Sequence, residues 1–74
     1  MAYFKYVLPK IQHIGIVIQF NDIKNFGIIR DNSGIEFPFS GSSIICRRIT
    51  TGDKVQFVEK IDGMRLTATS INKY

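Results

Sequence analysis

Residues 15–21 read Gly-Ile-Val-Ile-Gln-Phe-Asn, residues 24–29 read Lys-Asn-Phe-Gly-Ile-Ile, and residues 35–40 read Ile-Glu-Phe-Pro-Phe-Ser. Each stretch is a short, bounded run rich in β-branched and aromatic residues, which is the pattern of a strand rather than a helix. Residues 31–34, Asp-Asn-Ser-Gly, favour a hairpin turn because Asn and Gly accept the positive φ angles that such turns require. The three runs therefore predict an antiparallel meander.

Two more strands are expected further along the chain. Residues 54–60, Lys-Val-Gln-Phe-Val-Glu-Lys, alternate between apolar and polar, and residues 64–71 alternate again after the hairpin signal Asp62-Gly63. Residues 44–49 between the two groups are too short to distinguish a helical turn from irregular chain. Pro38 removes a ladder donor from the third run, so that run is expected at an edge or a bulge.

Three strands, a crossover and two strands suit an all-β protein that forms a small five-stranded OB-type β-barrel. Closure of such a barrel removes the exposed edges that a small open sheet would leave. A chain of 74 residues supports one hydrophobic core and no more. We divide it into an N-terminal apolar arm, residues 1–11, and one OB domain, residues 12–74.

Composition bounds the possible functions. The net charge of +4 and the pI near 9.5 favour polyanionic partners. Cys46 is the only cysteine and His13 the only histidine, so neither an internal disulfide nor a metal site is expected. No apolar run approaches the roughly 20 residues of a membrane span, and Lys5 and Pro9 interrupt the apolar start, which does not read as a secretory signal. We expect a soluble cytoplasmic protein.

The strand runs resemble the cold-shock domain, a five-stranded barrel that binds single-stranded RNA or DNA. The pattern of that family reads roughly G-x-V-K-W-F-N, then K-G-F-G-F-I, then V-F-V-H-F-S. Residues 51–57, Thr-Gly-Asp-Lys-Val-Gln-Phe, resemble its fourth strand, and residues 68–71, Ala-Thr-Ser-Ile, resemble its end. The likeness extends from residue 15 to about residue 71, and it implies that residues 12–74 form a cold-shock-like OB domain.

The resemblance implies a set of nucleic-acid contacts. Aromatic stacking is expected at the positions that keep the family's rings, and these are Phe20, Phe26 and Phe39. Asn21 and Lys24 also retain the motif residues. We expect phosphate contacts from the basic residues Lys24, Arg30 and Arg65. The alternative for any Phe in an all-β chain is the core, which is the expectation for Phe37 and Phe57.

The chain also departs from the family pattern. Gln19 replaces a Trp, Ile28 and Glu36 each replace a Phe, and Pro38 replaces a His. Stacking of a base on an aromatic ring contributes about 1–3 kcal/mol, so the loss of about half of the rings predicts weaker or differently specific binding. Glu36 would add repulsion toward phosphate if it lies on the binding face.

A second hypothesis is a protein-interaction or oligomerisation module that keeps a degenerate nucleic-acid platform. The arm, residues 1–11, carries three aromatic residues, and disordered segments are poor in such residues. The arm is therefore expected to pack on the barrel, to add a strand, or to recruit a partner protein or a second copy of the chain. The sequence has no carboxylate pair, phosphate-binding glycine loop or nucleophile elbow, so neither catalysis nor a cofactor is expected.

Overall fold

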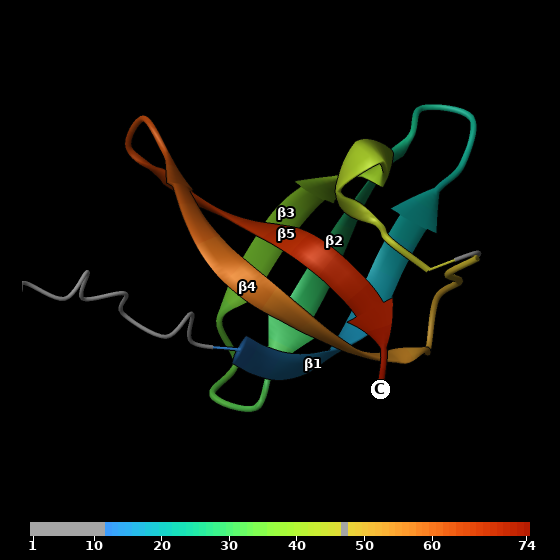
Figure 1. Ribbon diagram of the computed structural model, residues 1–74, viewed down its shortest axis with the longest axis horizontal. Coiled ribbons are helices and arrows are strands. Elements are labelled where there is room, and N and C mark those ends of the chain that lie inside the picture. The colour runs from blue at the N-terminus through green and yellow to red at the C-terminus, as the bar shows by residue number, and fades with distance from the viewer. Residues whose placement is uncertain (1–11, 47) are drawn as a thin grey trace, which may run out of the picture.

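Five antiparallel strands form one curled sheet in the computed structural model, which describes residues 12–46 and 48–74 (Figure 1). The elements in chain order are β1 (Gln12–Asn21), β2 (Phe26–Asp31), β3 (Glu36–Ser40), the 3-10 turn η1 (Gly41–Ser43), β4 (Lys54–Asp62) and β5 (Arg65–Lys73). The order within the sheet is β3-β2-β1-β4-β5. The predicted all-β class and the three-plus-two arrangement are confirmed. The expectations for the arm, residues 1–11, lie outside the described residues.

Side chains that cap the turns explain where the strands end. The Oδ1 atom of Asn21 accepts hydrogen bonds from the backbone N–H groups of Ile23 and Lys24, at 3.0 and 2.9 Å. The Oδ1 atom of Asp31 accepts from Ser33 and Ile35 in the same way, at 2.9 Å each. Such Asx turns satisfy backbone donors that the ladder leaves open, which sets the register of the meander.

The meander and the β4–β5 hairpin are joined by β1, which pairs with both β2 and β4. Residues 12–16 of β1 lie opposite residues 54–58 of β4. The crossover extends this contact, because the Val17 N–H donates to the Asp53 carbonyl at 3.0 Å and the Gly52 N–H donates to the Val17 carbonyl at 2.7 Å. One central strand therefore holds both parts of the sheet.

Side-chain packing brings the two ends of the sheet together, and no continuous ladder of hydrogen bonds joins them. In this respect the structure differs from the expected closed barrel. Strands β3 and β5 are the two ends of the sheet order, and their side chains pack against each other across a seam. One isolated parallel bridge, Ile44 to Ile71, lies beside this seam, and the Ile45 N–H donates to the Ile71 carbonyl at 2.8 Å. Pro38 lies in the edge strand β3, where its missing donor costs no ladder bond.

The core consists of the inward side chains of all five strands and one crossover residue. Its members are Val17, Ile29, Phe37, Phe39, Ile49, Val55, Phe57, Ala68 and Ile71. Phe37 meets Phe57 edge to face with ring centroids 5.0 Å apart, and His13 stacks on Phe57 at 5.3 Å. The predictions that Phe37 and Phe57 are core residues are confirmed.

Gly27 occupies a position in this core where no side chain fits. It lies between Phe20 on β1 and Phe39 on β3, directly opposite each. A Cβ atom at Gly27 would lie 2.5 Å from Cζ of Phe39 and 2.6 Å from the Gln19 carbonyl oxygen. The bare backbone lets the Phe20 and Phe39 rings stack with centroids 5.7 Å apart and planes 13° from parallel.

Gly27→Ala is therefore expected to destabilise the fold by about 1–3 kcal/mol, because the added methyl group forces the Phe39 ring or the strand to move. The urea denaturation midpoint, followed by circular dichroism, measures this change. The control is Ser33→Ala in the exposed β2–β3 turn, which is expected to stay within about 0.5 kcal/mol of the parent. Equal midpoints for the two variants would contradict the packing described here.

Candidate nucleic-acid interface

The outer face of β1, β2 and β3 carries three rows of side chains, each row running across the three strands. The rows are Asn21–Phe26–Ser40, Gln19–Ile28–Pro38 and Ile16–Arg30–Glu36. Residues directly opposite one another in a sheet share a face. Phe26 is the only aromatic residue in these rows, and 42% of its surface is exposed.

Three aliphatic side chains lie among the polar residues of the outer face. Ile16 is 40% exposed, and Ile28 and Pro38 are half-buried. Ile28 and Pro38 stand where the resemblance leads one to expect an aromatic ring and a His. The three rows therefore carry one aromatic ring, three aliphatic side chains and five polar or charged ones.

The third row contains an ion pair that neutralises two of the charges on this face. Arg30 donates from Nη2 to Oε2 of Glu36 at 2.7 Å and from Nε to the same oxygen at 3.2 Å. Both side chains are about half exposed, so the pair contributes little to stability. It does lower the repulsion toward phosphate expected of Glu36, and it gives Arg30 a partner that a phosphate would have to replace.

A groove of about 310 Å³ runs along the seam between β3 and the β4–β5 hairpin. We call it the seam groove. The Phe26 ring lines it on one side, and Lys60 and Arg65 line it on the other. The hydroxyl-bearing residues Ser40, Ser42, Ser43 and Thr67 also line it. The structure thus brings together Phe26 and Arg65, which lie far apart in the sequence.

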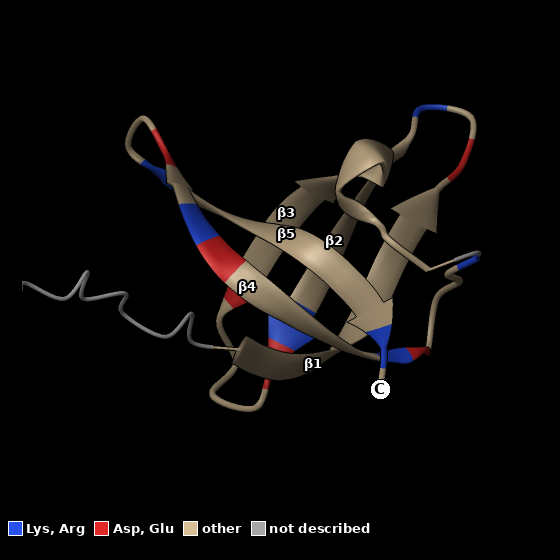
Figure 2. Cartoon of the chain, in the orientation of Figure 1, with Lys and Arg blue, Asp and Glu red and all other residues tan. Residues whose placement is uncertain are grey.

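The cations of the seam groove are available to a ligand. Neither Lys60 nor Arg65 forms an ion pair with any residue that the structure describes. Asp62 also lines the groove and lies opposite Arg65 in the ladder, so the groove carries one net positive charge. Figure 2 shows these charges of both signs along the outer part of the hairpin.

The arrangement of the five strands is similar to that of a solved structure. The chain superposes on the structure described as "drosophila Unr CSD456", a cold-shock-domain structure, with a TM-score of 0.75. The chain has the fold of a cold-shock domain. The alignment has 22% sequence identity and covers 88% of this chain and 27% of that one, so this chain spans about a quarter of the Unr chain. No protein-family model matches the sequence, and no curated protein is significantly similar to it.

Within this cold-shock fold, Phe39 does not occupy the predicted position. Phe39 is only 3% exposed and its ring packs on Phe20 over Gly27. The Phe39 ring is therefore not the exposed surface that was predicted, because residues 37 and 39 of a strand share the inner face. Phe39 still lines the seam groove, and its contact with nucleic acid stays a prediction. Phe20 lies on the same inner face and is half-buried, so part of its surface is available to a ligand.

Asn21 and Lys24 lie at the β1–β2 turn, at the end of the row that contains Phe26. The side-chain Oδ1 atom of Asn21 already accepts two turn hydrogen bonds, which leaves the side-chain NH2 group to donate to a ligand. Lys24 is exposed. Neither residue lines the seam groove, and their nucleic-acid contacts stay predictions.

Sequence reasoning did not select Lys60. The signal was present, because a two-residue hairpin loop after Asp62 places Lys60 opposite Thr67 and Asp62 opposite Arg65. This register puts Lys60 and Arg65 on one face of the hairpin. A phosphate contact predicted for Arg65 therefore also indicates Lys60.

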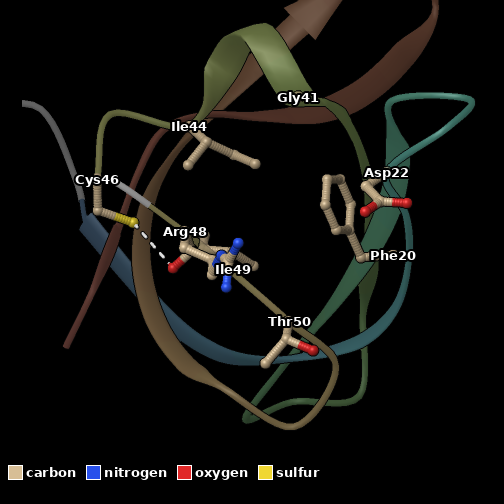
Figure 3. A pocket seen from close by; sticks show the side chains of 8 residues that line it. All are labelled: Phe20, Asp22, Gly41, Ile44, Cys46, Arg48, Ile49 and Thr50. Atoms are coloured by element: carbon tan, nitrogen blue, oxygen red, sulfur yellow. Dashed lines mark hydrogen bonds between the residues drawn. The ribbon is translucent and has the colours of Figure 1, made fainter.

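A second, larger cavity of about 810 Å³ lies at one end of the cold-shock fold, where the β1–β2 turn, η1 and the crossover meet (Figure 3). We call it the end cavity. Phe20 and Ile49 supply apolar walls, while Asp22 and Arg48 contribute opposite charges. This balance of charge suits a polyanion less well than the seam groove, despite the larger volume.

Within residues 12–46 and 48–74, no three His, Cys, Asp or Glu side chains come together as metal ligands would. No helix there has the length and apolar character needed to cross a membrane.

The placement of the two rings predicts different effects on stability. Phe39→Ala is expected to cost about 3–5 kcal/mol because it leaves a cavity in the core. Phe26→Ala is expected to cost roughly 1 kcal/mol because much of its ring already contacts water. Urea denaturation of both variants measures the difference, and similar costs would contradict the assignment of opposite faces.

Proposed function

We propose that this chain binds single-stranded RNA or DNA in the seam groove, without catalysis. The observation that carries the proposal is that one groove combines the exposed Phe26 ring with the cations Lys60 and Arg65. Proteins that bind single strands combine a stacking ring with positive charge along the backbone path. The cold-shock fold supports the same function.

Each part of the groove has a distinct chemical task. A base stacks on Phe26, and the phosphates on either side of it contact Lys60 and Arg65. Hydroxyl groups such as those of Ser42 and Thr67 both donate and accept hydrogen bonds, so they suit base edges or sugar hydroxyls. These contacts are tolerant of sequence, since every base has a face that stacks.

The bound nucleic acid continues from the seam groove across the first row of the outer face. Its path runs past Ser40, Phe26 and Asn21 and reaches Lys24 in the β1–β2 turn. Arg30 lies two rows away and contacts phosphate only after release from Glu36. A contact with Phe20 requires that the nucleic acid enter the end cavity, which Phe20 lines.

The expected affinity is modest and depends strongly on salt. One ring contributes about 1–3 kcal/mol, whereas micromolar affinity needs about 8 kcal/mol, so phosphate contacts must supply much of the rest. Two phosphates neutralised by Lys60 and Arg65 give a slope of about −1.4 in a plot of log affinity against log salt.

Fluorescence anisotropy with labelled pyrimidine heptamers of RNA and DNA tests this proposal. Phe26→Ala is expected to weaken binding roughly 5- to 150-fold, which corresponds to the loss of one stacked base. Lys60→Gln is expected to reduce the magnitude of the salt slope by about 0.7. Lys54→Gln at the opposite end of β4 is the charge-matched control and should leave the slope unchanged.

Two results would count against the seam groove. One is a wild-type protein that shows no saturable binding of either heptamer at physiological salt. The other is a Phe26→Ala variant that folds and binds like the wild type, which would place the nucleic acid elsewhere.

The aliphatic side chains on the outer face favour a second function, a protein-interaction or oligomerisation module. Ile16 is 40% exposed, and Ile28 and Pro38 continue the apolar surface across β2 and β3. Contiguous exposed apolar surface of this kind marks contact sites for proteins. In this reading the arm, residues 1–11, or a second copy of the chain covers the face.

Light scattering coupled to size exclusion tests this second function. A protein–protein contact through this face predicts a mass above that of the monomer at high concentration. The excess is lost in Ile16→Lys or on removal of residues 1–9. A monomer mass for the full chain at every concentration would argue against self-association.

A further inference from the structure

Four polar side chains share one face of the β4–β5 hairpin and line the seam groove. They belong to neighbouring pairs of the ladder, in which Lys60 lies opposite Thr67 and Asp62 lies opposite Arg65. Residues two apart along a strand point to the same face, so both pairs lie on that face. We call Lys60, Asp62, Arg65 and Thr67 the hairpin square.

Cations and hydrogen-bond acceptors alternate around the hairpin square. Lys60 and Arg65 lie at the two ends of one diagonal, and Asp62 and Thr67 lie at the two ends of the other. Opposite residues in a sheet have Cβ atoms about 5 Å apart, and diagonal neighbours are about 7–8 Å apart. The four side chains are therefore close enough to contact one ligand together.

Both members of the second diagonal offer acceptors to a ligand. The Asp62 carboxylate only accepts hydrogen bonds, and it forms no ion pair with the described residues. The Thr67 hydroxyl donates its proton to the Lys60 carbonyl at 3.2 Å, so only the lone pairs of its oxygen remain. On the β3 side of the groove, by contrast, the Ser40 and Ser42 hydroxyls bond to each other at 2.9 Å. The hairpin square therefore suits a ligand that combines phosphates with a hydrogen-bond donor.

We propose that the hairpin square makes the seam groove selective for RNA over DNA through the ribose 2′-hydroxyl group, an inference that rests on the proposed function. One sugar lies between each two consecutive phosphates of a nucleic-acid strand. Phosphates on Lys60 and Arg65 therefore place a sugar between the two acceptors. A ribose in this position donates its 2′-hydroxyl proton to Asp62, the stronger acceptor of the two, whereas deoxyribose has no such donor.

This contact accounts for a carboxylate in a groove that binds phosphates. Toward DNA, Asp62 only repels the phosphates and finds no donor. Toward RNA, a hydrogen bond from the 2′-hydroxyl group to an ionised acceptor offsets that repulsion. Asp62 thus gives specificity by rejecting the wrong ligand as well as by binding the right one.

The test is fluorescence anisotropy with three labelled cytidine heptamers, which are RNA, DNA and 2′-fluoro RNA. Cytosine is the same base in RNA and DNA, and the 2′-fluoro group keeps an RNA-like sugar conformation but cannot donate a hydrogen bond. The wild type is expected to bind the RNA heptamer roughly tenfold more tightly than either of the other two, which is the effect of one hydrogen bond to a charged acceptor.

The double variant Asp62→Ala with Thr67→Val removes both acceptors and keeps both cations. It is expected to bind the three heptamers within about twofold of one another. It should also bind the DNA heptamer more tightly than the wild type does, because a charge that repels phosphate is gone. A variant that merely disturbs the hairpin would instead bind all three heptamers more weakly.

The matched control is Asp22→Ala, which removes a carboxylate that lines the end cavity and not the seam groove. It should keep the preference for RNA. Thermal melting checks that each variant folds. If the double variant does not fold, the comparison of the RNA and 2′-fluoro heptamers on the wild type still decides the inference.

The outcomes separate this inference from the proposed function. Equal affinity of the wild type for RNA and DNA, or a 2′-fluoro heptamer that binds like RNA, overturns the selectivity and leaves single-strand binding intact. A preference for RNA that persists in the folded double variant also overturns it, since the 2′-hydroxyl group would then meet other acceptors. A wild type that binds none of the heptamers overturns both proposals.

Discussion

The close approach of the Phe39 ring to the bare backbone of Gly27 determines which side chains the meander shows to solvent. A Cβ atom at Gly27 would overlap that ring, so this position must face inward and must be glycine. Side chains alternate along a strand, and the inward Gly27 therefore turns its neighbours Phe26 and Ile28 outward. The exposed ring of the seam groove follows from a constraint on the opposite face of the sheet.

The strands were predictable from the sequence because their signals are local. Alternation, Asx-turn residues and hairpin glycines each act over a few positions, and the structure places all five strands where these signals are. Phe39 shows how a motif can mislead. Parity and the family pattern both favour a core position for Phe37, and the family resemblance implies an exposed ring at Phe39. In the structure both rings are buried, because residues two apart in a strand point the same way.

The candidate site itself was harder to predict, because it forms between segments that are distant in the sequence. Phe26 comes from the meander, whereas Lys60 and Arg65 come from the last hairpin. Only the curl of the sheet brings β3 beside β5, and no local pattern encodes that curl. The ion pair of Arg30 with Glu36 is a similar case, because it joins two strands and cancels charge on the outer rows.

The pairing of β1 with β4 has a consequence for the order in which this domain folds. The meander and the β4–β5 hairpin each close loops of a few residues, which is rapid and costs little chain entropy. The β1–β4 ladder must instead bring together residues 16 and 54 across the whole meander and crossover. Contacts of such sequence separation slow folding. The transition state is therefore expected to contain the β1–β4 ladder, with two preformed local units docking along one central strand.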